Sequence, residues 1–139
     1  MTMETINSPA KSQRMRVGGP LGVLLVIDSA PLLMRMGEVV RSIEGLRLVG
    51  SFTGVAQAVD WLVWDRGGWH LAFVDLALGE SGDALVQRLL SQPRPGSVVA
   101  VGDHLWREAR EKCRQMGVYE LLEKGDVVAF RGFLEARAQ

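Results

Sequence analysis

Five short apolar runs alternate with five helical patterns from Leu21 to the C-terminus, and this alternation constrains the fold more than any other feature. The apolar runs span 23–27, 46–52, 71–76, 97–102 and 119–123. The helical patterns span 31–43, 55–64, 83–90, 105–116 and 127–138. Strands joined by helices of this length are parallel, because the chain returns through a right-handed crossover.

Three of the five runs lack strict apolar–polar alternation, which is typical of strands buried on both faces. The pattern therefore predicts a doubly wound α/β sandwich in a single domain, with helices on both faces of the sheet. We expect the flavodoxin-like form: a five-stranded parallel sheet of order 2-1-3-4-5 with five helices. The 139 residues are enough for one core and too few for two.

Residues 1–19 are polar and basic without periodicity, so we expect a flexible N-terminal leader before a domain spanning 20–139. No apolar run approaches the length of a membrane span, and no signal-peptide pattern is present. The chain has one cysteine, Cys113, which excludes an internal disulfide and suits a reducing compartment. We expect a cytoplasmic protein with no membrane partner. Cys113 lies on the apolar stripe of its helix and is predicted to be buried.

Sixteen basic and sixteen acidic residues cancel, which argues against direct nucleic-acid binding. The turn after the first strand reads DSAP, which is neither a dinucleotide-binding loop nor a P-loop. The two histidines have no cysteine or carboxylate at ligand spacing, so a zinc site is not predicted.

The chemistry-bearing residues stand where strands end. Ligands of such sheets bind outside the carboxyl ends of the strands, next to the switch in strand order. Strands 1 and 3 end in Asp28 and Asp75, and strand 5 ends in Glu123 and Lys124. Two carboxylates and a lysine are therefore predicted to converge. Like charges need a nearby cation, which Mg²⁺ or the Lys124 ammonium would supply.

Each of the three residues also has an ordinary structural interpretation. Asp28 could cap the helix that starts near Pro31, and Lys124 could be a solvated surface lysine. Capping is a weaker explanation for Asp75, because LALGESG follows it rather than a helix. The combination of the three is more specific than any one of them.

These residues and their order resemble the receiver domain of bacterial two-component response regulators. The resemblance covers about 21–138 and rests on VLLVIDSAPLLMRMGEVV, LRLVGSFTGVAQAV, LAFVDLALGESGDALVQRLL, SVVAVGDH and GVYELLEKGD. It implies that Asp75 is the phosphoacceptor and that Lys124 is the lysine of the active site. It also implies Mg²⁺ ligation by Asp28, Asp75 and the backbone carbonyl of Ala77. A histidine kinase or another signalling protein is the implied partner.

Four positions depart from the pattern of the family. Ser29 stands where a second acid ligates the metal, which weakens the predicted site, so we expect Mg²⁺ binding to be weak or absent. Gly102 replaces the switch hydroxyl of strand 4, and Leu121 replaces the switch aromatic residue of strand 5. Gly125 replaces the proline after the lysine, and the loop after Asp75 is one residue shorter and lacks its proline.

These departures favour an atypical stand-alone receiver that acts through protein–protein interaction, with weak or no Mg-dependent phosphorylation at Asp75. It is expected to have no enzymatic activity beyond self-catalysed phosphoryl transfer. One alternative is a conventional receiver that takes a phosphoryl group from a histidine kinase on Asp75. A second is a small flavodoxin-like cofactor-binding protein or enzyme, which has only the fold in its favour.

The chain ends soon after the last helix, so we expect any output to pass through a protein partner. In receivers the usual contact surface is formed by helix 4, strand 5 and helix 5. An apolar patch in this region is the candidate interface, with a homodimer as one use; its residues are Trp106, Val128, Phe130 and Phe133. These residues could equally wrap the end of the core.

Overall fold

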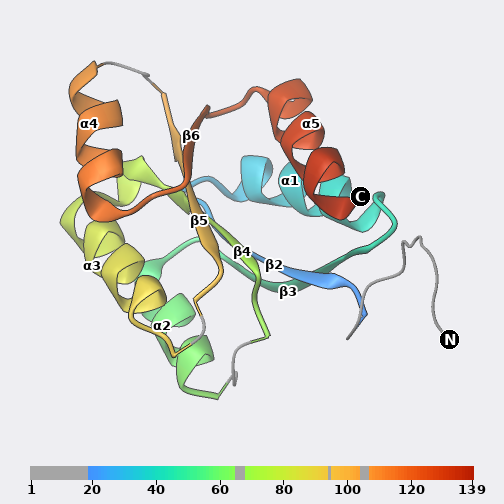
Figure 1. The fold of residues 1–139 in the computed structure, drawn as a ribbon, viewed down its shortest axis with the longest axis horizontal. Helices are drawn as coiled ribbons and strands as arrows, with labels where there is room; N and C mark the ends of the chain where they lie inside the picture. Colours follow the sequence, from blue (N-terminus) through green and yellow to red (C-terminus); the bar gives the residue numbers. More distant parts are fainter. Residues whose placement is uncertain (1–18, 65–67, 94, 104–106) are drawn as a thin grey trace, which may run out of the picture.

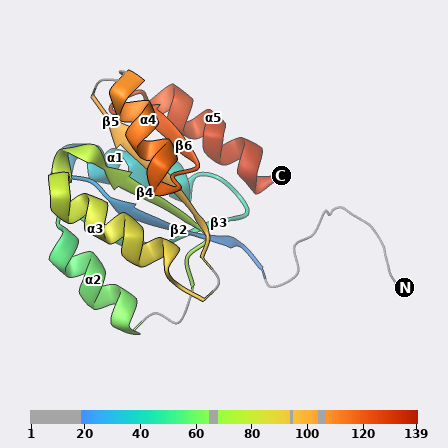
Figure 2. The same ribbon diagram turned by 60° about the vertical axis from the view of Figure 1, so that its left-hand side comes forward.

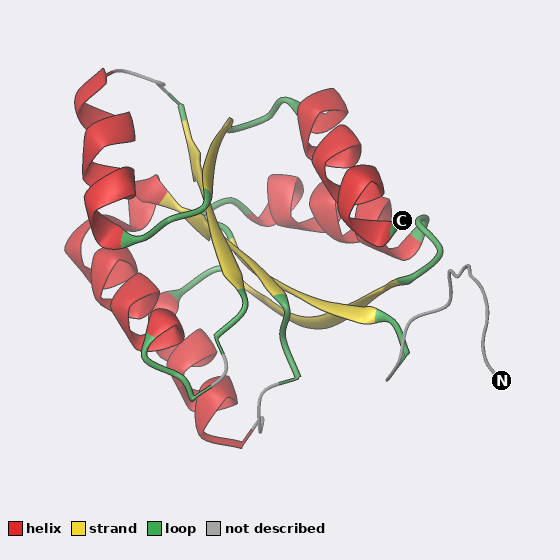
Figure 3. Ribbon diagram, in the orientation of Figure 1, coloured by secondary structure: helices red, strands yellow, loops and turns green. Residues whose placement is uncertain are grey.

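A five-stranded parallel sheet forms the centre of the molecule (Figures 1 and 3). The computed structural model describes residues 19–64, 68–93, 95–103 and 107–139. The strands are β2 Leu21–Val26, β3 Leu46–Phe52, β4 Leu71–Asp75, β5 Ser97–Gly102 and β6 Glu120–Glu123. Their order is β3-β2-β4-β5-β6, which confirms the predicted order 2-1-3-4-5. The predicted leader lies outside the described residues, apart from Gly19.

Five α-helices cover the two faces of the sheet. They are α1 Ala30–Arg41, α2 Val55–Trp64, α3 Gly79–Leu90, α4 Arg107–Met116 and α5 Val127–Ala138. Figure 1 shows α1 and α5 on one face and α2, α3 and α4 on the other, and Figure 2 gives a turned view of the same ribbon. Among the described residues, no helix is long and apolar enough to cross a membrane.

The unbroken apolar run of β2 follows from its position between two helical layers. Val23 and Leu25 pack toward α1 and α5, whereas Leu24 and Val26 pack toward α2 and α3. Successive side chains of a strand point to opposite faces, so a strand covered on both sides needs apolar residues at every position. All four side chains are fully buried.

The helix after β4 begins earlier than the prediction of 83–90. A 3-10 helix, η1 Leu76–Leu78, follows β4 directly, and α3 starts at Gly79. Gly79 has φ of +65°, a left-handed conformation that glycine adopts without steric cost. This sharp turn brings α3 back over the sheet four residues sooner than its apolar periodicity indicates.

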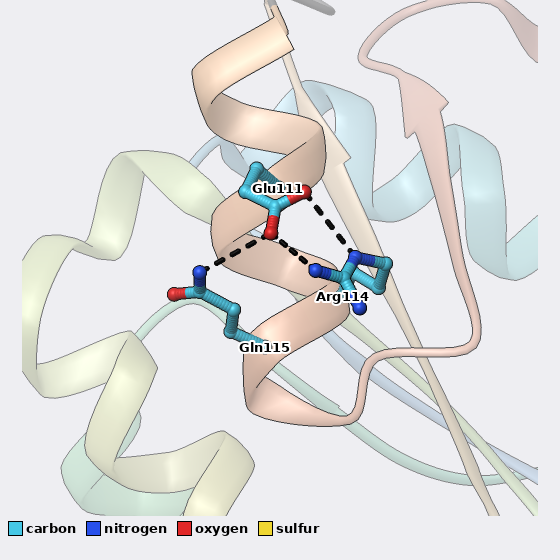
Figure 4. Close-up of polar contacts among 3 residues, drawn as sticks. All are labelled: Glu111, Arg114 and Gln115. Carbon is cyan, nitrogen blue, oxygen red and sulfur yellow. Dashed lines mark hydrogen bonds and ion pairs between the residues drawn. The ribbon is translucent and has the colours of Figure 1, made fainter.

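Three of the six charged side chains of α4 form ion pairs with neighbours: Glu111, Lys112 and Arg114. Glu111 accepts hydrogen bonds from Arg114 and Gln115 on the same helix (Figure 4). The Arg114 guanidinium lowers the pKa of the Glu111 carboxyl. Lys112 forms an ion pair with α3, in which its Nζ lies 2.7 Å from Oδ2 of Asp83. The first set of contacts lies within α4, and the Lys112–Asp83 ion pair joins α4 to α3.

Candidate functional site

Asp75 ends β4 and is completely buried. Both of its carboxylate oxygens have partners. Oδ1 accepts a hydrogen bond from the Ala77 N–H at 2.9 Å, and Oδ2 accepts one from the Asp28 N–H at 3.0 Å. Oδ2 also lies 2.8 Å from Nζ of Lys124. A buried carboxylate requires such compensation, since an isolated charge in the protein interior is strongly disfavoured.

Lys124 reaches Asp75 because β6 ends beside β5. The Lys124 N–H donates to the Gly102 carbonyl at 2.7 Å, which extends the strand pairing by one residue. The side chain is 15% exposed, and its ammonium is therefore mostly withdrawn from water. The hydrogen bond to Asp75 raises the pKa of Lys124 above its usual value, with additional charge from Asp103 and Asp28.

The structure brings Asp28 to the site through its backbone and not through its carboxylate. The Asp28 side chain is exposed and forms no hydrogen bond or ion pair with the described part of the chain. Of the three groups predicted to converge, the Asp75 carboxylate and the Lys124 ammonium are therefore in contact. Asp28 contributes its backbone N–H and a nearby negative charge.

The helix-capping interpretations of the two aspartates are both corrected. Ser29, and not Asp28, is the N-cap of α1, because its Oγ accepts the Leu32 N–H at 3.3 Å. Asp75 caps η1 through the Ala77 N–H, although no helix was predicted directly after it. Capping at Asp75 coexists with the ion pair, since the two interactions use different oxygens.

The residues present do not fit a magnesium site well. Mg²⁺ prefers carboxylate and water oxygens in octahedral geometry. Both Asp75 oxygens already accept hydrogen bonds, Lys124 already supplies a positive charge beside them, and the Ser29 hydroxyl is neutral and serves as a cap. Within the described residues, no three His, Cys, Asp or Glu side chains gather as a ligand set. The Ala77 carbonyl as a metal ligand stays a prediction.

An open cleft of about 360 Å³ lies outside this ion pair. It is lined by Ser29, Pro31, Leu32, Arg35, Asp103, Lys124 and Gly125. Asp75 is not part of the lining, because its neighbours cover it. Asp103 and Arg35 were not among the predicted site residues. Asp103 could have been found, since it is the first charged residue after an apolar strand, whereas Arg35 lies in the second turn of α1 and nothing in the sequence marks it.

The structure shows the surroundings of two positions that depart from the receiver pattern, Leu121 and Gly125. Leu121 is buried against Ala100 and Cys113 beneath α4. Cys113 is buried as predicted. Gly125 has φ of +89°, which proline cannot adopt because its ring fixes φ near −65°. The turn after Lys124 is therefore incompatible with the proline usual at this place.

The candidate interface is only partly exposed. Val128 is 83% exposed, but Phe130 is buried and packs edge-to-face on Phe73. The prediction that Phe130 contributes to an exposed patch is wrong, because α5 turns it into the core. Phe133 is half-buried beside Tyr119, an exposed ring that was not predicted as part of the patch. Trp106 lies outside the described residues.

Solved structures similar to this chain include response regulator receiver domains. A response regulator from Thermotoga maritima is 16% identical with a TM-score of 0.70, covering 85% of this chain and 93% of its own. A CheY-like receiver domain from Methylobacillus flagellatus is 21% identical with a TM-score of 0.65, covering 86% and 99%. A chain in the complex of the CheA3 P1 domain with CheY6 from R. sphaeroides is 18% identical with a TM-score of 0.70, covering 86% and 94%.

No family model and no curated protein matches the sequence. The structural likenesses extend over most of the chain at low sequence identity, and they show that this protein has the receiver fold.

The Lys124–Asp75 pair predicts a loss of stability at alkaline pH. The raised pKa of Lys124 means that the pair contributes its full stability below 10.5, the usual pKa of a lysine, and loses it as pH rises through the higher pKa of the folded state. Thermal unfolding of the wild type and of Asp75→Asn should be compared across this range. We expect the wild type to lose more stability than Asp75→Asn, because only the wild type has the ion pair. The contributions of the other lysines are the same in both proteins and cancel in the comparison. Parallel pH curves would contradict the prediction.

Proposed function

We propose that this protein is a receiver of a two-component or phosphorelay system that acts by protein–protein interaction, with weak or no Mg-dependent phosphorylation at Asp75. The observation that carries the proposal is the complete burial of Asp75 with Nζ of Lys124 at 2.8 Å. A carboxylate in this state behaves as one half of an internal ion pair and not as an exposed nucleophile.

Phosphoryl transfer to Asp75 requires a carboxylate oxygen to approach phosphorus in line with the leaving group. Oδ2 accepts from both Lys124 and the Asp28 N–H, and Oδ1 caps η1. Attack by either oxygen would therefore break contacts that compensate a buried charge. The Lys124 ammonium already supplies the positive charge that a divalent cation would bring to such a site.

The groups that would report phosphorylation are also absent. A hydroxyl on β5 could hold a phosphoryl oxygen, but Gly102 has no side chain. Leu121, in the place of the switch aromatic residue, is fixed in the core beneath α4. Both substitutions favour one stable conformation over a switch between two.

The proposed partner is a histidine kinase or another signalling protein, by analogy with the CheA3 P1–CheY6 complex. The exposed apolar residues near α5 and β6 offer a contact surface. Tyr119 is 59% exposed and Val128 is 83% exposed. Arg137 lies over the Tyr119 ring at 4.2 Å and holds it in place. A homodimer through the same face is a second use of this surface, which sedimentation at high concentration would test.

Exposure to acetyl phosphate or beryllofluoride with Mg²⁺ tests the phosphorylation part of the proposal. We expect no stoichiometric adduct by intact mass, because Asp75 is buried and fully hydrogen-bonded. The Asp75→Asn variant is the control for labelling at other carboxylates. A stoichiometric adduct on the wild type that disappears in this variant would establish the conventional receiver instead. Visible absorbance of the purified protein would favour the cofactor-binding alternative.

A further inference from the structure

Leu76, the residue directly after Asp75, fills the space above Gly102. A Cβ atom at Gly102 would lie 2.8 Å from Cδ1, 3.5 Å from Cγ and 3.7 Å from Cβ of Leu76. The first distance is shorter than carbon atoms tolerate, so a side chain on Gly102 would force the flexible end of the Leu76 side chain to move. The two residues therefore form a matched pair, in which the absence of one side chain makes room for the other.

Leu76 also belongs to a small apolar cluster beneath α4. The cluster has Ala100, Cys113 and Leu121 at its centre, and Leu76, Ala109 and Val118 pack against it. Ala100 and Gly102 share one face of β5, since strand residues two apart point the same way. Ala100 pairs with Leu121 of β6. Leu76 thus reaches from the end of β4 across β5 toward α4.

The turn that carries Leu76 is held by the candidate site. Oδ1 of Asp75 accepts the Ala77 N–H and caps η1, while Oδ2 binds Lys124. A change that repositions this carboxylate changes the capping of η1, and with it the position of Leu76. Leu78 lies in the same turn but packs against a different cluster, between the sheet and α2 and α3.

We propose that Leu76 is a packing link that couples the state of the Asp75 site to α4. In this arrangement an apolar contact performs the communication for which Gly102 and Leu121 lack the side chains. This proposal goes beyond the proposed function. The packing of Leu76 would change whether Asp75 is modified, is replaced by another residue, or no longer pairs with Lys124. Its loss opens the contact between α4 and the sheet at Cys113.

The reactivity of Cys113 measures this opening. Cys113 is the only cysteine of the chain and is 4% exposed, beside a surface cleft lined also by Arg110 and Tyr119. Burial raises the pKa of its thiol, which slows labelling further. The experiment follows labelling of Cys113 by a chromogenic disulfide under native conditions, with global stability measured in parallel.

We expect Leu76→Ala to accelerate labelling by about tenfold, which corresponds to a local opening that is about 1.4 kcal/mol easier. Leu78→Ala is the matched control, because it removes the same side chain from the same turn but from the other cluster. It should change labelling by less than about twofold. Equal acceleration by both variants, or none by Leu76→Ala, would overturn the proposal.

Two further variants test the coupling from opposite ends. Asp75→Asn alters the carboxylate, and Gly102→Ala pushes Leu76 aside. Each should accelerate labelling when Leu76 is present and have no added effect in the Leu76→Ala background, because coupled residues act non-additively. The same acceleration in both backgrounds would refute the link. No phosphoryl donor is involved, so this result is independent of whether Asp75 accepts phosphate.

Discussion

Replacing Lys124 with methionine is expected to lower the free energy of unfolding by about 3 kcal/mol. The variant keeps an unbranched apolar side chain that is one atom shorter, and it removes the ammonium 2.8 Å from the fully buried Asp75 carboxylate. The value lies at the lower end for breaking a buried ion pair, because the N–H groups of Asp28 and Ala77 still bind the carboxylate. Urea unfolding of the wild type and the variant measures the difference.

Asp75→Asn is the matched control, and its effect should be smaller, about 1 kcal/mol. Asparagine keeps the shape of the side chain, and the Lys124 left behind is partly exposed near the charges of Asp103 and Asp28. The double variant should therefore be close to Asp75→Asn alone, because no buried charge remains for Lys124 to compensate. If Lys124→Met and Asp75→Asn were additive, the two groups would not form the internal pair that the structure shows.

Ser29→Asp is expected to create a dependence of stability on Mg²⁺ that the wild type lacks. Aspartate caps a helix as well as serine does, so α1 keeps its N-cap while the site gains a carboxylate beside Asp28. Mg²⁺ favours carboxylate oxygens over a neutral hydroxyl. A concentration about 100 times the dissociation constant would stabilise the variant by about 2.7 kcal/mol. Thermal unfolding with and without Mg²⁺ measures this effect.

Ser29→Asn separates the charge from the cap, since asparagine is also a good N-cap but adds no carboxylate. It should respond to Mg²⁺ no more than the wild type. A wild type stabilised by Mg²⁺ as strongly as Ser29→Asp would contradict the inference that its own residues fit the ion poorly. An unresponsive Ser29→Asp variant would show that Lys124 excludes the cation whatever residue occupies position 29.

The architecture could be predicted because it depends on patterns that repeat along the chain. The apolar run of β2 and the helical spacing of α2 indicate their structures locally. The rules for parallel strands then limit the sheet to a few orders, one of which is the flavodoxin-like order. The start of α3 was missed because Gly79 and the η1 turn obey local backbone geometry and not apolar periodicity. In the same way, the sequence left Phe130 open between a surface patch and the end of the core, because α5 is apolar on more than one side, and the structure places it in the core.

The sequence by itself determined which strand ends carry Asp75 and Lys124, because the carboxyl ends of all strands of a parallel sheet lie along one edge. Only the tertiary structure decided what these groups do to each other. The burial of Asp75, the capping role of Ser29 and the packing of Leu76 over Gly102 depend on distances between residues far apart in sequence. Such distances depend on how the helices pack against the sheet, and the order of the residues alone does not specify them.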